Sequence, residues 1–255
     1  MPIDLALLYA STALEIAVVA ILFHSRITRV FPVFSVYLAW TICSDVTAFA
    51  LRTSPSYLNF YFAETILDSV LQFSVLLELA WSVLRPFRTA LPRSTPWILG
   101  VALLVMGAAV WPLAGLTEMT KLTPQWHALI KLQQTFAMLR IIFFLVLAAC
   151  SQVLAIGWRN RELQVATGLG AFSLANMAAS LIHTHQKSIT QYHVVDRMLV
   201  VAYVGMLTYW AFSFRQQEAP RKELSPRMQS VLLTVAGSAR ANRIALEELR
   251  KSGKL

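Results

Sequence analysis

The chain has 255 residues, of which 57% are hydrophobic and only 14% are charged, and its mean hydropathy is +0.58. These values exclude an ordinary soluble domain of this size and indicate a protein of the lipid bilayer. The net charge of +9 is concentrated in a few loops and the C-terminal tail, so we expect anionic lipid headgroups as partners and no nucleic acid.

Apolar blocks long enough to cross about 30 Å of hydrocarbon as helices recur along the chain. We predict an all-α, polytopic membrane protein with seven transmembrane helices, over residues 3–23, 31–51, 58–84, 96–115, 127–156, 163–184 and 192–214. The first span contains Glu15 and lacks a preceding basic region and a small-residue cleavage site, so we expect it to remain in the mature protein. Residues 1–215 form the predicted transmembrane domain.

Lys and Arg are distributed unequally between the two sets of loops. One set carries Arg26, Arg29, Arg85, Arg88, Arg93, Arg159, Arg161 and the tail from Arg215, whereas the opposite set carries Arg52, Lys121 and Lys187. Cytoplasmic loops are enriched in Lys and Arg. The bias predicts an inner-membrane protein with its N-terminus outside and its C-terminus in the cytoplasm.

Residues 216–255 form a predicted basic cytoplasmic tail. An apolar stripe in it recurs at spacings of three and four: Met228, Leu232, Val235, Ala239, Leu246 and Leu249. This spacing predicts an amphipathic helix over about residues 226–251 that lies on the inner leaflet. Homo-oligomerisation or docking of a cytoplasmic protein partner is the alternative, because the stripe has heptad-like spacing.

The third span carries three carboxylates, Glu64, Asp68 and Glu78. At about 100° per residue they share one face of the helix. A charged side chain facing lipid costs about 3 kcal/mol, so this face is expected to point into the bundle. Glu78 lies nearer the cytoplasmic end, where Arg85 or Arg88 is a candidate partner.

Other spans carry ionisable residues at overlapping depth: Glu15 in the first, Asp45 in the second, Arg140 in the fifth and Asp196 in the seventh. With a rise of about 1.5 Å per residue, Asp45, Glu64 and Asp68 lie roughly 10–16 Å below the outer surface, and Glu15 and Arg140 nearer the middle. We expect these six residues to converge on an outward-facing polar cavity. The acids outnumber Arg140, so at least one carboxyl is expected to be protonated or bound to a cation.

The fourth span has no ionisable residue and is expected at the periphery of the bundle. Four histidines, His127, His183, His185 and His193, fall near the outer ends of spans five to seven, together with Asp196. Imidazole and carboxylate ligands are suitable for zinc, but no two of these histidines stand at the i, i+4 spacing on one helix. We therefore favour interfacial histidines and no cofactor. Retinal is excluded, because residues 192–214 contain no lysine for a Schiff base.

The run "YFAETILDSVLQFSVLLELAWSVLRP", which follows a second helix beginning "RVFPVFSVYLAW", resembles a group of uncharacterised bacterial seven-helix integral membrane proteins. The shared pattern is Tyr, then Glu, then an apolar stretch with a second Glu before a Leu-Arg-Pro exit. It covers about the first third of the chain. The resemblance implies a seven-helix fold and carries no activity or catalytic residue.

Three hypotheses for function remain open. The leading one is a receptor-like protein or carrier whose outward-facing polar cavity binds a small polar or cationic ligand or a proton; the chain shows no recognised nucleophile or nucleotide motif that would favour an enzyme. The second is a metal-dependent intramembrane hydrolase that acts on lipid. The third is a structural scaffold, in which polar residues only join helices and the tail binds a partner.

Overall fold

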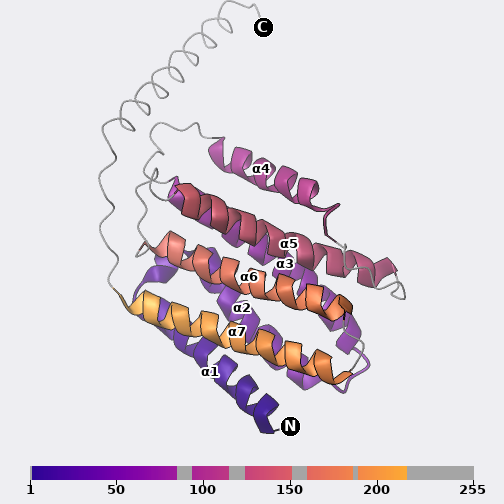
Figure 1. Ribbon diagram of the computed structural model, residues 1–255. Helices are drawn as coiled ribbons and strands as arrows, with labels where there is room; N and C mark the ends of the chain where they lie inside the picture. Colours follow the sequence, from indigo (N-terminus) through magenta and orange to yellow (C-terminus); the bar gives the residue numbers. More distant parts are fainter. Residues whose placement is uncertain (1, 85–93, 115–123, 151–159, 186–188, 217–255) are drawn as a thin grey trace, which may run out of the picture.

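The computed structural model describes residues 2–84, 94–114, 124–150, 160–185 and 189–216 (Figure 1). These residues are helical and contain no strand. The elements are α1 (Pro2–His24), η1 (Ile27–Arg29), α2 (Pro32–Leu51), α3 (Tyr57–Val83), α4 (Thr95–Val110), α5 (Pro124–Cys150), α6 (Arg161–His185) and α7 (Ile189–Arg215). Each predicted span corresponds to one of the α-helices. The tail, with its predicted helix over about residues 226–251, lies outside the described residues.

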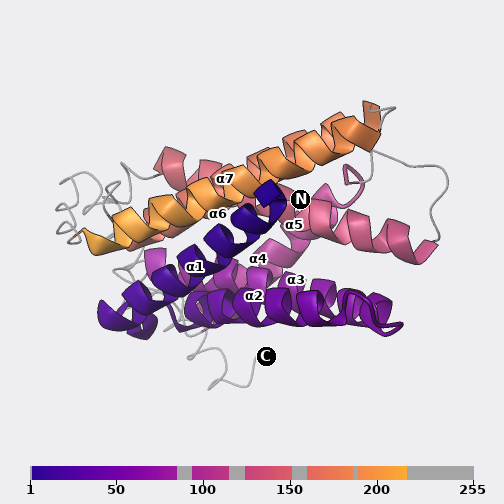
Figure 2. The same cartoon turned by 90° about the horizontal axis from the view of Figure 1, so that it is seen from below.

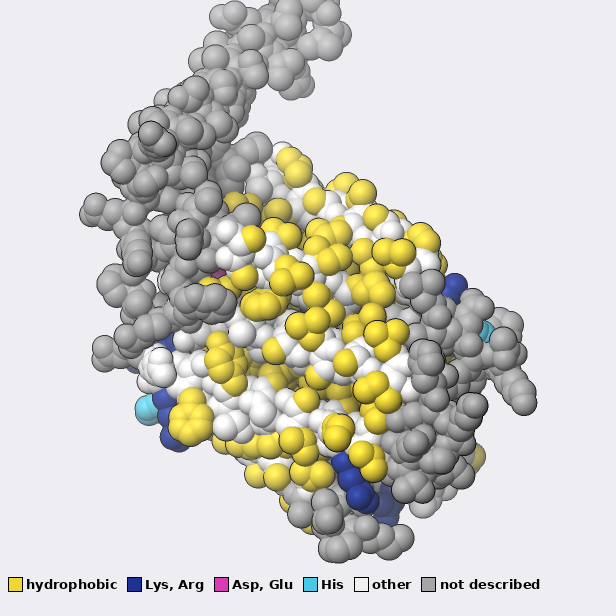
Figure 3. Space-filling model, viewed as in Figure 1, with side chains coloured by type: hydrophobic (Ala, Val, Ile, Leu, Met, Phe, Trp, Pro, Cys, Tyr) yellow, Lys and Arg dark blue, Asp and Glu magenta, His cyan; other side chains and the backbone are white. Residues whose placement is uncertain are grey.

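Five of the helices, α2, α3, α5, α6 and α7, are long and apolar enough to cross a membrane. α4 is apolar as well but has only 16 residues. In α1, the shorter segment from Tyr9 to His24 is apolar. Figure 3 shows one face of the bundle covered by hydrophobic side chains, with Lys, Arg and His at its margins. The chain is therefore a multi-pass helical membrane protein.

The helices form two layers. Helices α5, α6, α7 and α1 lie side by side in this order, and the pair α2–α3 lies behind them (Figures 1 and 2). α4 packs at the edge against α3 and α5, which confirms its predicted peripheral position. We call the end at which α2 passes into α3 the Arg52 end, and the end that holds η1 the Arg26 end.

The apolar core occupies the half of the bundle nearer the Arg26 end. Leu22, Phe34, Leu79, Leu163 and Trp210 are fully buried there, and they come from α1, α2, α3, α6 and α7. The rings of Phe34 and Trp210 are 5.0 Å apart in an edge-to-face arrangement. Aromatic pairs of this kind add to the stability that area burial supplies.

Two glycines allow close approach of α6 to its neighbours. A Cβ atom at Gly168 would overlap the ring of Trp210 in α7, and one at Gly170 would lie 2.6 Å from Cβ of Phe144 in α5. Small residues at such positions are the usual means by which membrane helices pack closely. The layer α5–α6–α7 is therefore tightly packed.

Polar contacts also hold the Arg26 end together. The guanidinium of Arg161 donates to the carbonyl oxygens of Ser213 (2.8 Å) and Gln216 (2.6 Å) at the end of α7. The hydroxyl of Ser82 in α3 donates to the carboxylate of Glu162 at 3.0 Å. A cation beside the last carbonyls of a helix is favourable, because that end carries a partial negative charge.

Candidate functional site

The end of α2 and the beginning of α3 bring two carboxylates together near the Arg52 end. Asp45 and Glu64 each lie about two turns from the connection between these helices. They interact electrostatically. Two neighbouring carboxylates repel when both are ionised, so the pair favours a proton or a cation.

Asp68 and Arg140 meet one to two turns further into the bundle. The side-chain amide of Gln72 donates to the Asp68 carboxylate, and Gln72 also shares a hydrogen bond with the hydroxyl of Tyr37. Arg140 is only 5% exposed and interacts electrostatically with Asp68. This attraction offsets part of the cost of burying the guanidinium.

Glu15 lies at a similar depth on the other side of the bundle. Its side chain is 0% exposed, and the hydroxyl of Tyr203 in α7 donates to its Oε1 atom at 2.6 Å. Glu15 also interacts electrostatically with Asp45. The first and last helices are therefore linked to the same polar region as α2 and α3.

The structure thus brings five of the six predicted site residues into one electrostatically connected group. We call it the carboxylate cluster: Glu15, Asp45, Glu64, Asp68 and Arg140. The sixth residue, Asp196, is exposed on α7, and none of these interactions involves it. The cluster lies between the two layers, where α1 and α5 face the pair α2–α3.

Exposure within the cluster decreases with distance from the Arg52 end. Asp45 is exposed, Glu64 and Asp68 are half-buried, and Glu15 and Arg140 are buried. Beyond them, toward the Arg26 end, lies the apolar core. The cluster members nearer the Arg52 end are therefore the more exposed ones.

Two buried polar atoms of the cluster have no hydrogen-bond partner among the described residues: Oε2 of Glu15 and Nε of Arg140. Buried polar atoms are nearly always hydrogen-bonded, and an exception in a native structure needs an explanation. A proton or a donor group would satisfy the carboxylate oxygen of Glu15, whereas the Nε–H group of Arg140 needs an acceptor, such as a water or a ligand oxygen.

Of the four histidines predicted as weak candidates for zinc, the structure describes the side chain of one. His127 is half-buried near the beginning of α5, and the side chains of His183, His185 and His193 lie outside the described residues. Within the described part of the chain, no three His, Cys, Asp or Glu side chains are placed to hold a metal ion. The zinc hypothesis gains no support from this geometry.

Glu78, the deepest acid of α3, accepts hydrogen bonds from the backbone N–H groups of Val33 (2.8 Å) and Phe34 (2.9 Å) at the beginning of α2. Its predicted partners, Arg85 and Arg88, lie outside the described residues. A carboxylate at a helix N-terminus is stabilised by the unpaired N–H groups and the helix dipole. Glu78 therefore joins two helices and is not part of the carboxylate cluster.

Three polar residues of the site were missing from the predicted set: Tyr37, Gln72 and Tyr203. Tyr37 lies on the same face of α2 as Asp45, and Gln72 stands one turn from Asp68. This shared face was the available signal. The partnership of Tyr203 with Glu15 had no local signal, because 188 positions separate the two residues.

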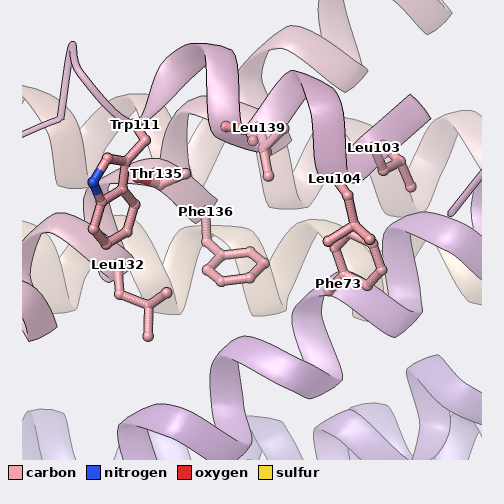
Figure 4. A pocket seen from close by; sticks show the side chains of 10 residues that line it. Phe73, Leu103, Leu104, Trp111, Leu132, Thr135, Phe136 and Leu139 are labelled. Atoms are coloured by element: carbon pink, nitrogen blue, oxygen red, sulfur yellow. The ribbon is translucent and has the colours of Figure 1, made fainter. Parts of the chain in front are cut away.

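A second feature is an apolar groove between α4 and α5, with a volume of about 340 Å³ (Figure 4). Its lining includes Phe73, Leu104, Gly107, Trp111, Leu132 and Phe136. It contains none of the cluster residues and differs in character from the predicted polar cavity.

No family model matches this chain, and no curated protein or solved structure matches it.

Proposed function

We propose that this chain is a seven-span membrane protein whose carboxylate cluster binds a proton or a small organic cation, as part of a receptor-like protein or a carrier. The observation that supports this proposal is the charge balance of the cluster. It contains four acids, Glu15, Asp45, Glu64 and Asp68, but a single cation, Arg140, which interacts with Asp68.

Charge that is buried between membrane helices needs compensation. Arg140 compensates at most one carboxylate, and Tyr203 donates one hydrogen bond to Glu15. The remaining negative charge has to be compensated by protons or by a bound cation. Oε2 of Glu15 is fully buried and has no partner among the described residues, so it is the position at which we place a ligand's N–H group or a proton.

The ligand would enter from the Arg52 end, where the exposed Asp45 and the half-buried Glu64 lie. Most loop Lys and Arg residues belong to connections at the opposite end. The positive-inside rule therefore supports an orientation with the N-terminus and the Arg52 end outside. In that orientation the cluster faces outward and the apolar core blocks passage to the cytoplasm.

Both layers contribute to the cluster, so its occupancy should change the way in which they pack. A receptor-like protein would transmit this change to its cytoplasmic side, whereas a carrier would use it to expose the cluster to the other side. Both outcomes require a ligand that binds the two packings with different affinity.

The test is thermal unfolding of the full chain in detergent, measured against the concentration of methylammonium, a small organic cation with N–H donors, with sodium at the same ionic strength as control. A ligand at about 100 times its dissociation constant stabilises the folded state by about 2.7 kcal/mol. We expect stabilisation of the wild type that weakens as the pH is lowered, because protons compete for the same carboxylates. The sodium control separates binding of the organic cation from the general effect of ionic strength on stability.

Two variants remove charge from the cluster, Glu64→Gln and Asp68→Asn, and both should abolish the stabilisation. Asp196→Asn is the matched control, since this acid is exposed and lies outside the cluster. The proposal is wrong if the wild type shows neither cation-dependent nor pH-dependent stability. It is also wrong if the cluster variants respond like the control.

A further inference from the structure

The groove between α4 and α5 is a separate candidate site, independent of the carboxylate cluster. Its volume of about 340 Å³ falls within the range of about 300–1,000 Å³ that is usual for ligand sites. In Figure 4 Trp111, Leu132 and Thr135 lie at one end of it, Phe136 and Leu139 in the middle, and Leu104 and Phe73 at the other end. It is elongated along the helices.

The lining is almost wholly hydrocarbon. Thr135 is a polar residue in it, and its hydroxyl donates to the carbonyl oxygen of Lys131 at 2.7 Å, which leaves its methyl group to the groove. Leu104 lines the groove and is 62% exposed. Because α4 lies at the edge of the bundle, the groove opens toward the surrounding lipid.

One end of the groove carries features of the membrane interface. Trp111 directly follows the last residue of α4, and Trp is enriched at the level of the headgroups. On α5, Lys131 lies one turn before Thr135, and His127 lies one turn before Lys131. α5 has 27 residues and is therefore about 40 Å long, more than the hydrocarbon thickness of about 30 Å, so its first turns extend toward the headgroups.

We infer that this groove binds an acyl chain of an anionic phospholipid, whose phosphate lies at Lys131. The chain would run from Trp111 down to Phe73. A lysine near the interface extends its ammonium group to the headgroups, and its charge is complementary to the phosphate. In the orientation proposed above, this is a lipid of the outer leaflet.

The experiment uses the full chain in vesicles of phosphatidylcholine and phosphatidylglycerol, each in turn carrying a photoactivatable diazirine on its acyl chain. After irradiation, the labelled residues are identified by mass spectrometry. We expect label concentrated on Leu104, Leu132 and Phe136. Lys131→Gln should lower the phosphatidylglycerol label by about fivefold, the effect of one cation near an anionic headgroup, and lower the phosphatidylcholine label less, because the choline cation already compensates that phosphate.

Two glycines of α4 give a matched pair of variants. A Cβ atom at Gly107 would lie 3.5 Å from Leu139, and one at Gly100 would meet nothing within 4 Å, so both positions accept a side chain. Gly107→Leu fills the groove, whereas Gly100→Leu adds the same side chain outside it. Both changes raise helix propensity equally. We expect only Gly107→Leu to lower the groove label, by at least about fivefold, because it occupies the site itself.

Two results would overturn the inference. Equal labelling of the groove and of the rest of the lipid-facing surface, unchanged by either variant, would show ordinary surrounding lipid only. If the groove residues carry no label and the protein is a dimer by size-exclusion chromatography, this face is instead a contact between two copies of the chain.

Discussion

The hydrogen bond between Tyr203 and Glu15 offers a quantitative test of the buried site. Its oxygen atoms are 2.6 Å apart, and Glu15 is 0% exposed. A hydrogen bond to a charged group contributes about 1.5–3 kcal/mol, and one between neutral groups about 0.5–1.5 kcal/mol. Tyr203→Phe removes the donor and leaves both carboxylate oxygens of Glu15 without a partner among the described residues.

We expect Tyr203→Phe to lower the free energy of unfolding by about 0.5–3 kcal/mol, a range that covers both a neutral and a charged Glu15. The measurement is reversible unfolding in mixed detergent micelles, followed by circular dichroism. Tyr209→Phe is the matched control, because Tyr209 is half-buried on the same helix and packs against the apolar core. It should change stability little.

A double-mutant cycle with Glu15→Gln isolates the pairwise contribution. If Glu15 is charged in the folded protein, the coupling free energy should reach the range for a charged acceptor; if it is neutral, it should fall in the lower range, about 0.5–1.5 kcal/mol. A coupling near zero, or a Tyr209→Phe variant as unstable as Tyr203→Phe, would refute the role assigned to this hydrogen bond.

Four further substitutions test other parts of the bundle by the same unfolding measurement. Glu78→Gln should cost about 1.5–3 kcal/mol, because one of two charge-assisted bonds to the beginning of α2 is lost; an unchanged stability would contradict the contact. Gly168→Ala should lower the free energy of unfolding by about 1–3 kcal/mol, because the new methyl group overlaps Trp210. At Gly205 a Cβ atom meets nothing within 4 Å, so Gly205→Ala should stabilise the protein by up to about 1 kcal/mol. Equal effects of the two variants would contradict the close packing at Gly168. Arg140→Gln should cost about 3–5 kcal/mol, because it leaves the neighbouring carboxylate uncompensated, and a smaller cost at low pH would be consistent with that cause.

Several features of the site follow from local geometry and could be predicted from the sequence. Glu64 and Asp68 share one face of α3 because the helix repeats every 3.6 residues or so, and the cost of charge in lipid indicates that this face points inward. Asp45, Glu15 and Arg140 could be placed at overlapping depth from their distance to the helix ends. These arguments need only the helix rise and the membrane thickness.

The partners of each side chain could not be predicted, because they depend on the order of helices in the bundle. The sequence did not indicate that Asp68 faces Arg140, or that Asp196 lies on the exposed surface of α7. Glu78 shows a second reason. Its partners are backbone N–H groups at the beginning of α2, and backbone donors are the same whatever the side chain, so the pattern of charged residues pointed only to Arg85 and Arg88.

The separation of Glu15 and of Glu78 from their hydrogen-bond partners along the chain has a consequence for biogenesis. Glu78 is synthesised 44 or 45 positions after the amides that it accepts from, so its partners are already present when it enters the membrane. Glu15 waits 188 positions for Tyr203, until the last described helix has been made. Glu15 therefore lacks the hydrogen-bond donor that it has in the folded protein until α7 has been made, and insertion of α7 is the step that completes the site.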